Sequence, residues 1–216
     1  MNNLIYKIGI AGSHCVGKST LTDVLKGALK QRDVEPHIVP EASTLARERG
    51  LPINENTTFS AQYHIFHTQC ANEVIYAESN RSPPNFDIII CDRTVVDNLG
   101  YFENKFGTHS LIRDNMKNHL QYFPYDIIYY VPIINNYLSS NLVVGNGIRS
   151  INLVFQKQLD KIIRSLFHEL SIPYVELPVP NDSHYLHEEW NTFLLNKTLK
   201  DLEKKLNRNF PQSFYK

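Results

Sequence analysis

Residues 12–19 read Gly-Ser-His-Cys-Val-Gly-Lys-Ser and match the pattern G-x-x-x-x-G-K-[ST] at every fixed position. An apolar, isoleucine-rich run, Leu4–Ala11, precedes this stretch and predicts a buried parallel strand. After it, apolar residues recur at spacings of three and four through Leu29, which predicts an amphipathic helix. A glycine-rich turn between a strand and a helix is the setting in which this pattern binds phosphate. The stretch therefore predicts an α/β fold whose first turn is a phosphate-binding loop.

The residue types in this loop explain how it would hold a triphosphate. Gly12 and Gly17 let the backbone turn so that successive N–H groups point at phosphate oxygens, and the following helix adds the positive end of its dipole. Lys18 is expected to neutralise the β- and γ-phosphates, and the Ser19 hydroxyl to ligate Mg²⁺. We therefore predict ATP and Mg²⁺ as ligands. The predicted nucleotide-binding residues are Gly12, Ser13, His14, Cys15, Val16, Gly17, Lys18, Ser19 and Thr20.

The rest of the chain alternates between short apolar runs and longer amphipathic stretches. The runs predicted as the second to fifth strands are His37–Pro40, Asp87–Cys91, Asp126–Val131 and Pro173–Leu177. The stretches predicted as further helices are Ala42–Arg49, Phe59–Ser79, Ile151–Leu170 and Asn196–Arg208. Strands that alternate with helices indicate βαβ units and a parallel sheet. We predict the fold of a phosphate-loop NTPase, a five-stranded parallel sheet in the order 2-3-1-4-5 flanked by helices, with a small lid.

The length of 216 residues suits one large α/β domain. We therefore predict a single domain over residues 1–216. Within it, the polar stretch at about 135–150 contains Gly145 and Gly147 and is the predicted lid. Residues from about 186 to 216 form the predicted C-terminal helical tail.

Composition narrows the class of protein and its partners. Lys+Arg equals Asp+Glu at 22 each, so no overall field would draw the chain to nucleic acid or to an anionic membrane. Gly9 and Gly12 break the apolar run at the N-terminus early, so we do not expect a signal peptide. No apolar run is long enough to span a bilayer. The three cysteines lack metal-ligand spacing and fit free thiols in a reducing compartment. We expect a cytoplasmic protein.

An acidic motif follows the predicted strand Asp87–Cys91. Asp92 and Arg93 come directly after this strand, at the edge where ligands bind in open parallel sheets. A carboxylate at this place can hold Mg²⁺ or accept the proton of an attacking hydroxyl, and Arg93 can attract a phosphate. The plainer alternatives are a helix cap for Asp92 and a surface ion pair for Arg93. Because the chain also carries a phosphate loop, we favour the functional interpretation.

Four motifs in order carry a resemblance to a known family. They are Gly12–Thr20, Val39-Pro-Glu-Ala42, Cys91-Asp-Arg-Thr94 and Gly147-Ile-Arg-Ser150. With them the chain resembles the small ATP-binding kinase domains often called AAA domain proteins, which include ribosylnicotinamide kinase domains. It is similar, more distantly, to deoxynucleoside and thymidylate kinases. The resemblance runs from about Ile5 to Leu177, and the four motifs together are more specific than the loop alone.

The resemblance implies a kinase and a set of site residues. Glu41 and Gln69 would hydrogen-bond the phosphoryl acceptor, and Arg47 would reach the acceptor or its phosphate. Arg149 would be the lid arginine that closes over the phosphates and stabilises developing charge. The implied substrate-contacting residues are Glu41, Arg47, Gln69 and Arg93, the implied catalytic residues are Lys18, Asp92, Arg93 and Arg149, and the implied metal ligands are Ser19 and Asp92. A helix cap, a solvated helix residue and a surface charge are the alternatives for Glu41, Gln69 and Arg47.

Two features depart from the pattern of the nucleoside kinases. Their residue after the third strand is often glutamate, whereas this chain has Asp92, which is shorter by one methylene. Asp92 would then serve chiefly as a metal ligand and leave the general base unassigned. The insert Asn135–Asn146 before Gly147 also alters the lid.

Three functions stay open on the sequence. The favoured one is an ATP-dependent phosphotransferase acting on a nucleoside, a nucleotide or a related small acceptor. The second is a kinase that acts on DNA or RNA ends or on a modified base in DNA, for which the basic stretch Asn196–Arg208 is the only support. The third is a nucleotide-gated regulatory module whose output is binding. The identity of the acceptor, the preference for ATP over GTP and homodimerisation also stay open.

Overall fold

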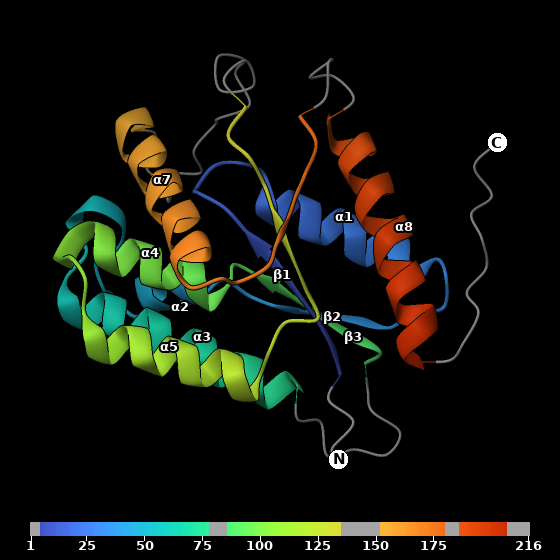
Figure 1. Cartoon of the computed structure of the whole chain (residues 1–216), viewed down its shortest axis with the longest axis horizontal. Helices are drawn as coiled ribbons and strands as arrows, with labels where there is room; N and C mark the ends of the chain where they lie inside the picture. Colours follow the sequence, from blue (N-terminus) through green and yellow to red (C-terminus); the bar gives the residue numbers. More distant parts are fainter. Residues whose placement is uncertain (1–4, 78–85, 135–151, 180–185, 207–216) are drawn as a thin grey trace.

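The computed structural model describes residues 5–77, 86–134, 152–179 and 186–206 (Figure 1). The predicted lid at 135–150, with Arg149, and the end of the predicted tail lie outside these residues. The strands are β1 (Tyr6–Ala11), β2 (Pro36–Val39), β3 (Ile88–Asp92), β4 (Ile127–Tyr130) and β5 (Val175–Glu176). The helices are α1 (Lys18–Lys30), α2 (Ala42–Glu48), α3 (Phe59–Ala77), α4 (Val95–Phe106), α5 (Ser110–Tyr122), α7 (Leu153–Glu169) and α8 (Leu186–Leu206), with a 3₁₀ turn at Asn54–Asn56.

The five strands form one sheet in the order β2-β3-β1-β4-β5, and every neighbouring pair is parallel. The predicted fold class and strand order are therefore confirmed. In the register of the sheet, Ile8 of β1 lies beside Ile90 of β3 and Ile127 of β4. All six residues of β1 are buried, as expected for the central strand of a sheet that helices cover on both faces.

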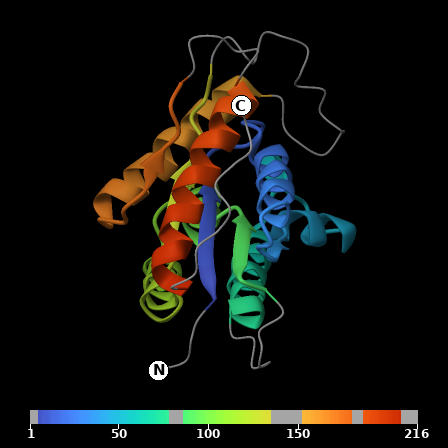
Figure 2. The same cartoon turned by 90° about the vertical axis from the view of Figure 1, so that its right-hand side faces the viewer.

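Helices α1 and α8 cover one face of the sheet. Apolar residues spaced by three and four on α1, such as Leu21 and Leu25, pack with Ile8 and Ile10 of β1. From α8, Trp190 joins the same cluster and donates its indole N–H to the Pro178 carbonyl at 2.7 Å. Figure 2 shows α8 and α1 side by side in front of the strands.

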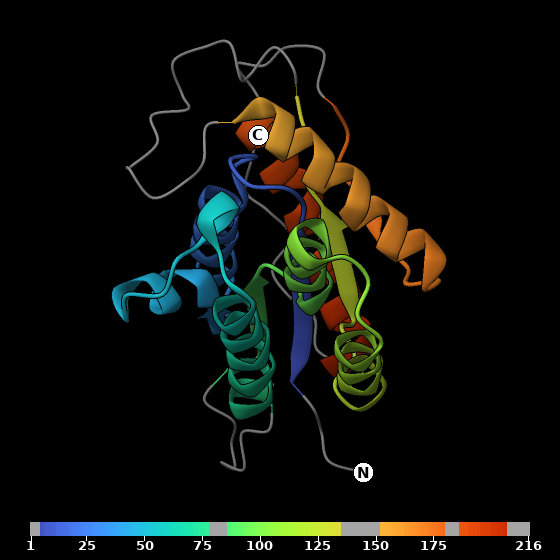
Figure 3. The same ribbon diagram turned by 90° about the vertical axis from the view of Figure 1, so that its left-hand side faces the viewer.

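Helices α3, α4, α5 and α7 lie on the other face (Figure 3). Their core contains Phe66 of α3, Leu99 of α4 and Ile163 of α7, packed with Ile128 of β4. Gly100 of α4 lets α7 approach closely, because a Cβ atom there would lie 2.6 Å from Ile163 Cγ1. The two helices therefore pack closely, and α4 also contacts the phosphate loop, since Asp97 Oδ1 accepts from Gly12 N.

Sequence reasoning did not predict α4 and α5, which occupy most of the chain between β3 and β4. The start of α4 carries a clear signal, a capping box in which Thr94 and Asp97 each accept a hydrogen bond from the backbone N–H of the other. Gly107, with φ of +75°, ends the same helix. At the other edge of the sheet, β5 has two residues and is shorter than predicted.

The parallel arrangement brings several chain segments to one edge of the sheet. The loop after β1 and the Asp92-Arg93 pair at the end of β3 meet there, because Arg93 N donates to Ile10 O at 3.2 Å. Val131, after β4, donates its N–H to Ala11 O at 2.9 Å and closes the same edge. None of the described helices is long and apolar enough to cross a membrane.

Candidate functional site

The turn between β1 and α1 has the backbone geometry of a phosphate-binding loop. Gly12, Cys15 and Gly17 have φ of +135°, +58° and +90°. A Cβ atom at Gly12 would lie 2.6 Å from Val131 O, so both its φ and the space beside it require glycine. Gly17 is the N-cap of α1 and places the N-terminus of that helix at the loop. Such a turn directs backbone N–H groups into one concavity, where an anion can bind.

Lys18 lies inside this loop. Its side chain is buried, and Nζ donates to Gly12 O at 2.8 Å and to Ser13 O. Burial and the nearby Arg93 guanidinium lower the pKa of Lys18 to about 8, although Asp97 and other carboxylates act in the opposite direction. A phosphate oxygen in the loop would give the ammonium group a charged partner in place of the two carbonyls.

Helix α7 supports the outer side of the loop. Ser13 Oγ donates to Gln156 O at 2.8 Å, and Gln156 Nε2 donates to His14 O at 2.6 Å. The His14 ring packs 5.2 Å from the Phe155 ring, centroid to centroid.

Val16 belongs to the core, so His14 and Val16 would reach a nucleotide through their backbone. Of the other predicted loop residues, Cys15 is half-buried and Thr20 is exposed on α1.

Asp92 and Ser19, the predicted metal ligands, are in contact. Ser19 and Asp92 share a side-chain hydrogen bond. Burial and the neighbouring Glu41 carboxylate raise the pKa of Asp92, whereas Ser19 and Lys18 act in the opposite direction. Among the described residues nothing hydrogen-bonds Asp92 Oδ1, although this oxygen is buried. A hydroxyl beside a carboxylate with a spare oxygen fits Mg²⁺, which prefers hard oxygen ligands completed by phosphate and water.

Arg93 is fixed through both its backbone and its guanidinium group. Its φ is +90°, which is rare for a residue with a side chain. Its Nε lies 2.7 Å from Glu41 Oε1, and its guanidinium carbon lies 4.7 Å from the centre of the Tyr101 ring. Burial opposes the charge, but Glu41 and Tyr101 raise the pKa of Arg93 above its ordinary value. The guanidinium therefore stays charged and points to the cleft beside α2.

This cleft is a candidate acceptor site. It is narrow, with a cavity volume of about 20 Å³, and it is lined by Glu41, Ser43, Ile53, Asn54, Gln62, Ile65, Arg93, Asn98 and Tyr101. Gln62 and Asn98 are each 3% exposed. Gln62 Nε2 donates to Thr57 Oγ1 at 3.0 Å, whereas Gln62 Oε1 and Asn98 Nδ2 have no hydrogen-bond partner among the described residues. A buried acceptor and a buried donor thus line one cleft, ready for a polar ligand.

Sequence reasoning did not select Gln62, Asn98 or Tyr101. No local pattern separates an amide on a helix that lines a cleft from one on a solvated face, so nothing in the sequence could have found Gln62. Asn98 lies one residue after Asp97, the acidic residue of the capping box. This position indicates that Asn98 is buried only when α4 has already been recognised as a helix.

The remaining predicted residues are placed as follows. Gln69 is fully buried, and its Nε2 donates to Glu73 Oε1 at 3.0 Å and to Arg93 O at 3.2 Å. It therefore lies beneath Arg93 and is not part of the cleft lining. Arg47 is exposed on α2, and Arg149 lies outside the described residues. The structure thus brings Lys18, Ser19, Asp92, Arg93 and Glu41 together and leaves Gln69 and Arg47 away from the cleft.

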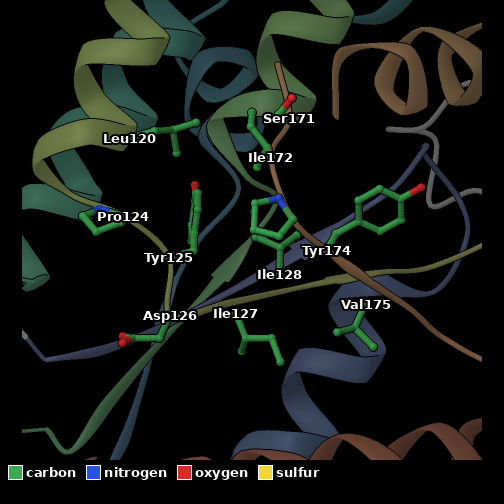
Figure 4. A pocket seen from close by; sticks show the side chains of 11 residues that line it. Leu120, Pro124, Tyr125, Asp126, Ile127, Ile128, Ser171, Ile172, Tyr174 and Val175 are labelled. Carbon is green, nitrogen blue, oxygen red and sulfur yellow. The ribbon is translucent and has the colours of Figure 1, made fainter. Parts of the chain in front are cut away.

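A larger cavity, of about 360 Å³, lies at the opposite end of β4 (Figure 4). Its lining is mostly apolar and includes Leu120, Ile127, Ile128, Ile172 and Tyr174. Two of its polar groups are already bonded within the protein, since Tyr125 donates its hydroxyl to Glu73 and Asp126 accepts from Lys205. It lies at the Ile127 end of β4, whereas the phosphate loop contacts Val131 at the other end. Size alone therefore does not identify the site.

Comparisons with known proteins agree with this geometry. A protein-family model described as an AAA domain matches residues 7–184. Comparison with curated protein sequences finds no match. Among solved structures, a NadR protein in complex with NAD and AMP-PNP has a TM-score of 0.66 at 12% identity, over 98% of this chain and 52% of that one. A NadR protein in complex with NR has a TM-score of 0.62 at 12% identity, over 99% and 53% of the two chains.

A third solved structure is deoxyadenosine kinase from M. mycoides, with the products dCMP and a flexible dCDP bound. It has a TM-score of 0.54 at 16% identity, over 89% of this chain and 98% of that one. The present chain spans about half the length of the NadR proteins that it matches. At these identities the likeness shows a shared fold, that of the phosphate-loop kinases.

Proposed function

Because the chain belongs to the AAA domain family, whose model matches most of it, we propose that it is an ATP-dependent kinase. Its acceptor would be a nucleoside, a nucleotide or a related small molecule. The observation that carries the proposal is the junction of the phosphate loop with the cleft. Lys18 and Ser19 belong to the loop. Asp92 contacts Ser19, and the next residue, Arg93, lines the cleft. Phosphoryl transfer needs two binding sites joined in this way.

The loop side would hold the triphosphate. The backbone N–H groups of the loop and the N-terminus of α1 would face the phosphates, and Lys18 would leave the Gly12 and Ser13 carbonyls to contact them. Ser19 and Asp92 would hold Mg²⁺, which neutralises the charge that develops on the phosphate oxygens. A loose transition state needs little help from a general base, so positioning and charge stabilisation would supply most of the rate.

The cleft side would hold the acceptor. Arg93 is the only cation among the described lining residues, and the Glu41 carboxylate lies 2.7 Å from its Nε. The Glu41 carboxylate, which lines the cleft, would orient the acceptor hydroxyl, and Arg93 would stabilise the transferring group. Deeper in the cleft, Gln62 and Asn98 would bond the donor and acceptor edge of a planar ring such as a nucleobase.

The first experiment is a coupled assay of ADP release with Mg²⁺, run across nucleosides, nucleoside monophosphates, ribosylnicotinamide and short DNA. We expect ADP release to rise sharply with at least one nucleoside-like acceptor and the phosphorylated product to appear in equal amount. Slow hydrolysis of equal rate with every acceptor would contradict the proposal. Stimulation by DNA alone, with steep salt dependence, would favour a kinase acting on nucleic acid instead.

Gln62 Oε1 and Asn98 Nδ2, the two amide atoms of the cleft without a partner among the described residues, give a sharper prediction. Gln62→Leu and Asn98→Leu are each expected to raise KM for the acceptor about 10- to 100-fold, because a ligand group would be left unpaired in a buried site. KM for ATP should stay within about twofold of wild type. Steady-state kinetics with each substrate varied in turn measures both. Asn118→Leu, at an exposed position of α5, is the matched control. An unchanged acceptor KM in both cleft variants would remove these residues from the acceptor site.

A further inference from the structure

Asp97 connects two parts of the candidate site that are distant in sequence. It lies in the first turn of α4 and is fully buried. One carboxylate oxygen, Oδ2, accepts from Thr94 N at 2.7 Å and from Thr94 Oγ1 at 2.6 Å. The other oxygen, Oδ1, accepts from Gly12 N at 2.7 Å, across 85 residues of sequence. A capping box uses only contacts within its own turn, so the bond to Gly12 is not explained by capping.

Both backbone polar groups of Gly12 are consequently hydrogen-bonded. Its N–H is bonded to Asp97, and its carbonyl accepts from Lys18 Nζ at 2.8 Å. We expect nucleotide binding to break the carbonyl bond, because Lys18 would then turn toward the phosphates. The Asp97 bond can persist, since Oδ1 and Gly12 N lie in the interior and α4 is locked against α7 at Gly100.

We propose that Asp97 is a positioning residue for the phosphate loop. By holding Gly12 N–H, it keeps the first turn of the loop in its binding conformation when Lys18 leaves the loop carbonyls. Loss of this bond lets the turn relax, so part of the binding energy of the nucleotide is spent on ordering the loop. The inference rests on the proposed function, because it assumes that the loop binds a triphosphate.

Four proteins test the proposal: wild type, Asp97→Ala, Asp97→Asn and Thr94→Val. Thr94→Val removes the hydroxyl of the capping box, keeps the methyl group that packs near Gly9 and leaves Gly12 untouched. Asp97→Asn can still accept from Gly12 through its amide oxygen. Its NH₂ group can donate to the Thr94 hydroxyl but cannot accept from Thr94 N, so this variant loses part of the cap. Calorimetry measures Kd for Mg·ATP, and thermal unfolding measures Tm.

We expect Asp97→Ala to weaken Mg·ATP binding about 10- to 100-fold, the effect of losing a hydrogen bond to a charged group. Asp97→Asn should recover at least half of that loss on a logarithmic scale, and Thr94→Val should bind ATP as wild type does. Both Thr94→Val and Asp97→Ala should lower Tm, because both weaken the cap of α4. Equal weakening of ATP binding in Thr94→Val and Asp97→Ala would overturn the proposal, and so would an Asn variant as weak as the Ala variant.

A measurement on the wild type keeps the proposal testable if Asp97→Ala does not fold. Hydrogen exchange followed by NMR should show the Gly12 amide strongly protected both without nucleotide and with Mg·ATP. Rapid exchange of this amide in the free protein would overturn the proposal. If wild type binds no ATP at all, the proposed function fails first, and a protected Gly12 amide would then mark a structural bond alone.

Discussion

Replacement of Lys18 by alanine is expected to lower kcat/KM for ATP by at least about 10²–10³-fold, the effect of removing one donor to developing charge. No other described cation lies inside the loop, and Nζ is held there by the Gly12 and Ser13 carbonyls. We expect the fold to persist, because the partners of Lys18 are backbone groups of a turn that remains anchored by α7. Turnover of ATP with a saturating acceptor, together with circular dichroism and Tm, measures the two effects.

Lys30→Ala is the matched control, since Lys30 lies at the end of the same helix with its side chain 49% exposed and paired with Glu35. This variant should keep both turnover and Tm. Wild-type turnover in Lys18→Ala would remove the loop from the reaction. A collapse of Tm would instead assign Lys18 a structural role, and the loss of activity would then say nothing about phosphate binding.

The phosphate loop and the Asp92-Arg93 pair could be predicted because their geometry follows from local sequence. A strand, a turn with glycine at two fixed places and a helix define the loop without any distant contact. Asp92 ends β3, and the parallel order of the strands brings it to Ser19. The alternation of strands and helices predicts a parallel sheet, and the phosphate loop after the first strand adds the strand order of the phosphate-loop NTPase fold.

The cleft could not be predicted in the same way, because its residues are selected by contacts between elements. Gln69 and Gln62 lie seven positions apart on α3, on nearly the same helical face and about 10 Å apart along the axis. The spacing of apolar residues indicates which face of α3 is buried, but not which turn of that face lines the cleft. The structure places Gln62 at the cleft and Gln69 under the Arg93 carbonyl.

Asp97 illustrates a further limit of sequence reasoning. Its spacing from Thr94 is a readable capping signal for α4. Its second role, the bond to Gly12 N, depends on how α4 packs against α7 and on the path of β1. A short local pattern therefore predicts the cap, whereas the contact with the loop becomes visible only in the folded chain.

Glu73→Gln is expected to be the most destabilising of the conservative substitutions considered, at about 3–5 kcal/mol in the free energy of unfolding. Glu73 is fully buried on α3, and its Oε2 lies 2.9 Å from Nζ of Lys7, which is 2% exposed. Its oxygens also accept from Tyr125 at 2.6 Å and contact His119 at 3.0 Å. A neutral side chain at this position leaves the Lys7 ammonium buried without its counter-charge. Urea unfolding at pH 7 measures the loss.

The pH dependence of this loss identifies its cause. Burial by itself would raise the pKa of Glu73, but Lys7, His119 and Tyr125 outweigh it and lower the pKa to about 2. An unfolded glutamate titrates near pH 4.3, so the stability that Glu73 supplies is complete above that pH and fades as the pH falls toward about 2. The deficit of Glu73→Gln should therefore shrink between about pH 5 and pH 2.

Two further variants separate the lost ion pair from a general effect of the substitution. Glu35→Gln makes the same change in an exposed pair, where Glu35 and Lys30 are 53% and 49% exposed, and should cost no more than about 0.5 kcal/mol. Lys7→Met added to Glu73→Gln removes the unpaired ammonium and should recover part of the stability, because an apolar replacement of a buried ion is tolerated. A deficit that persists unchanged at pH 2, or a double variant less stable than Glu73→Gln, would show that packing around α3, and not the buried charge, sets the cost.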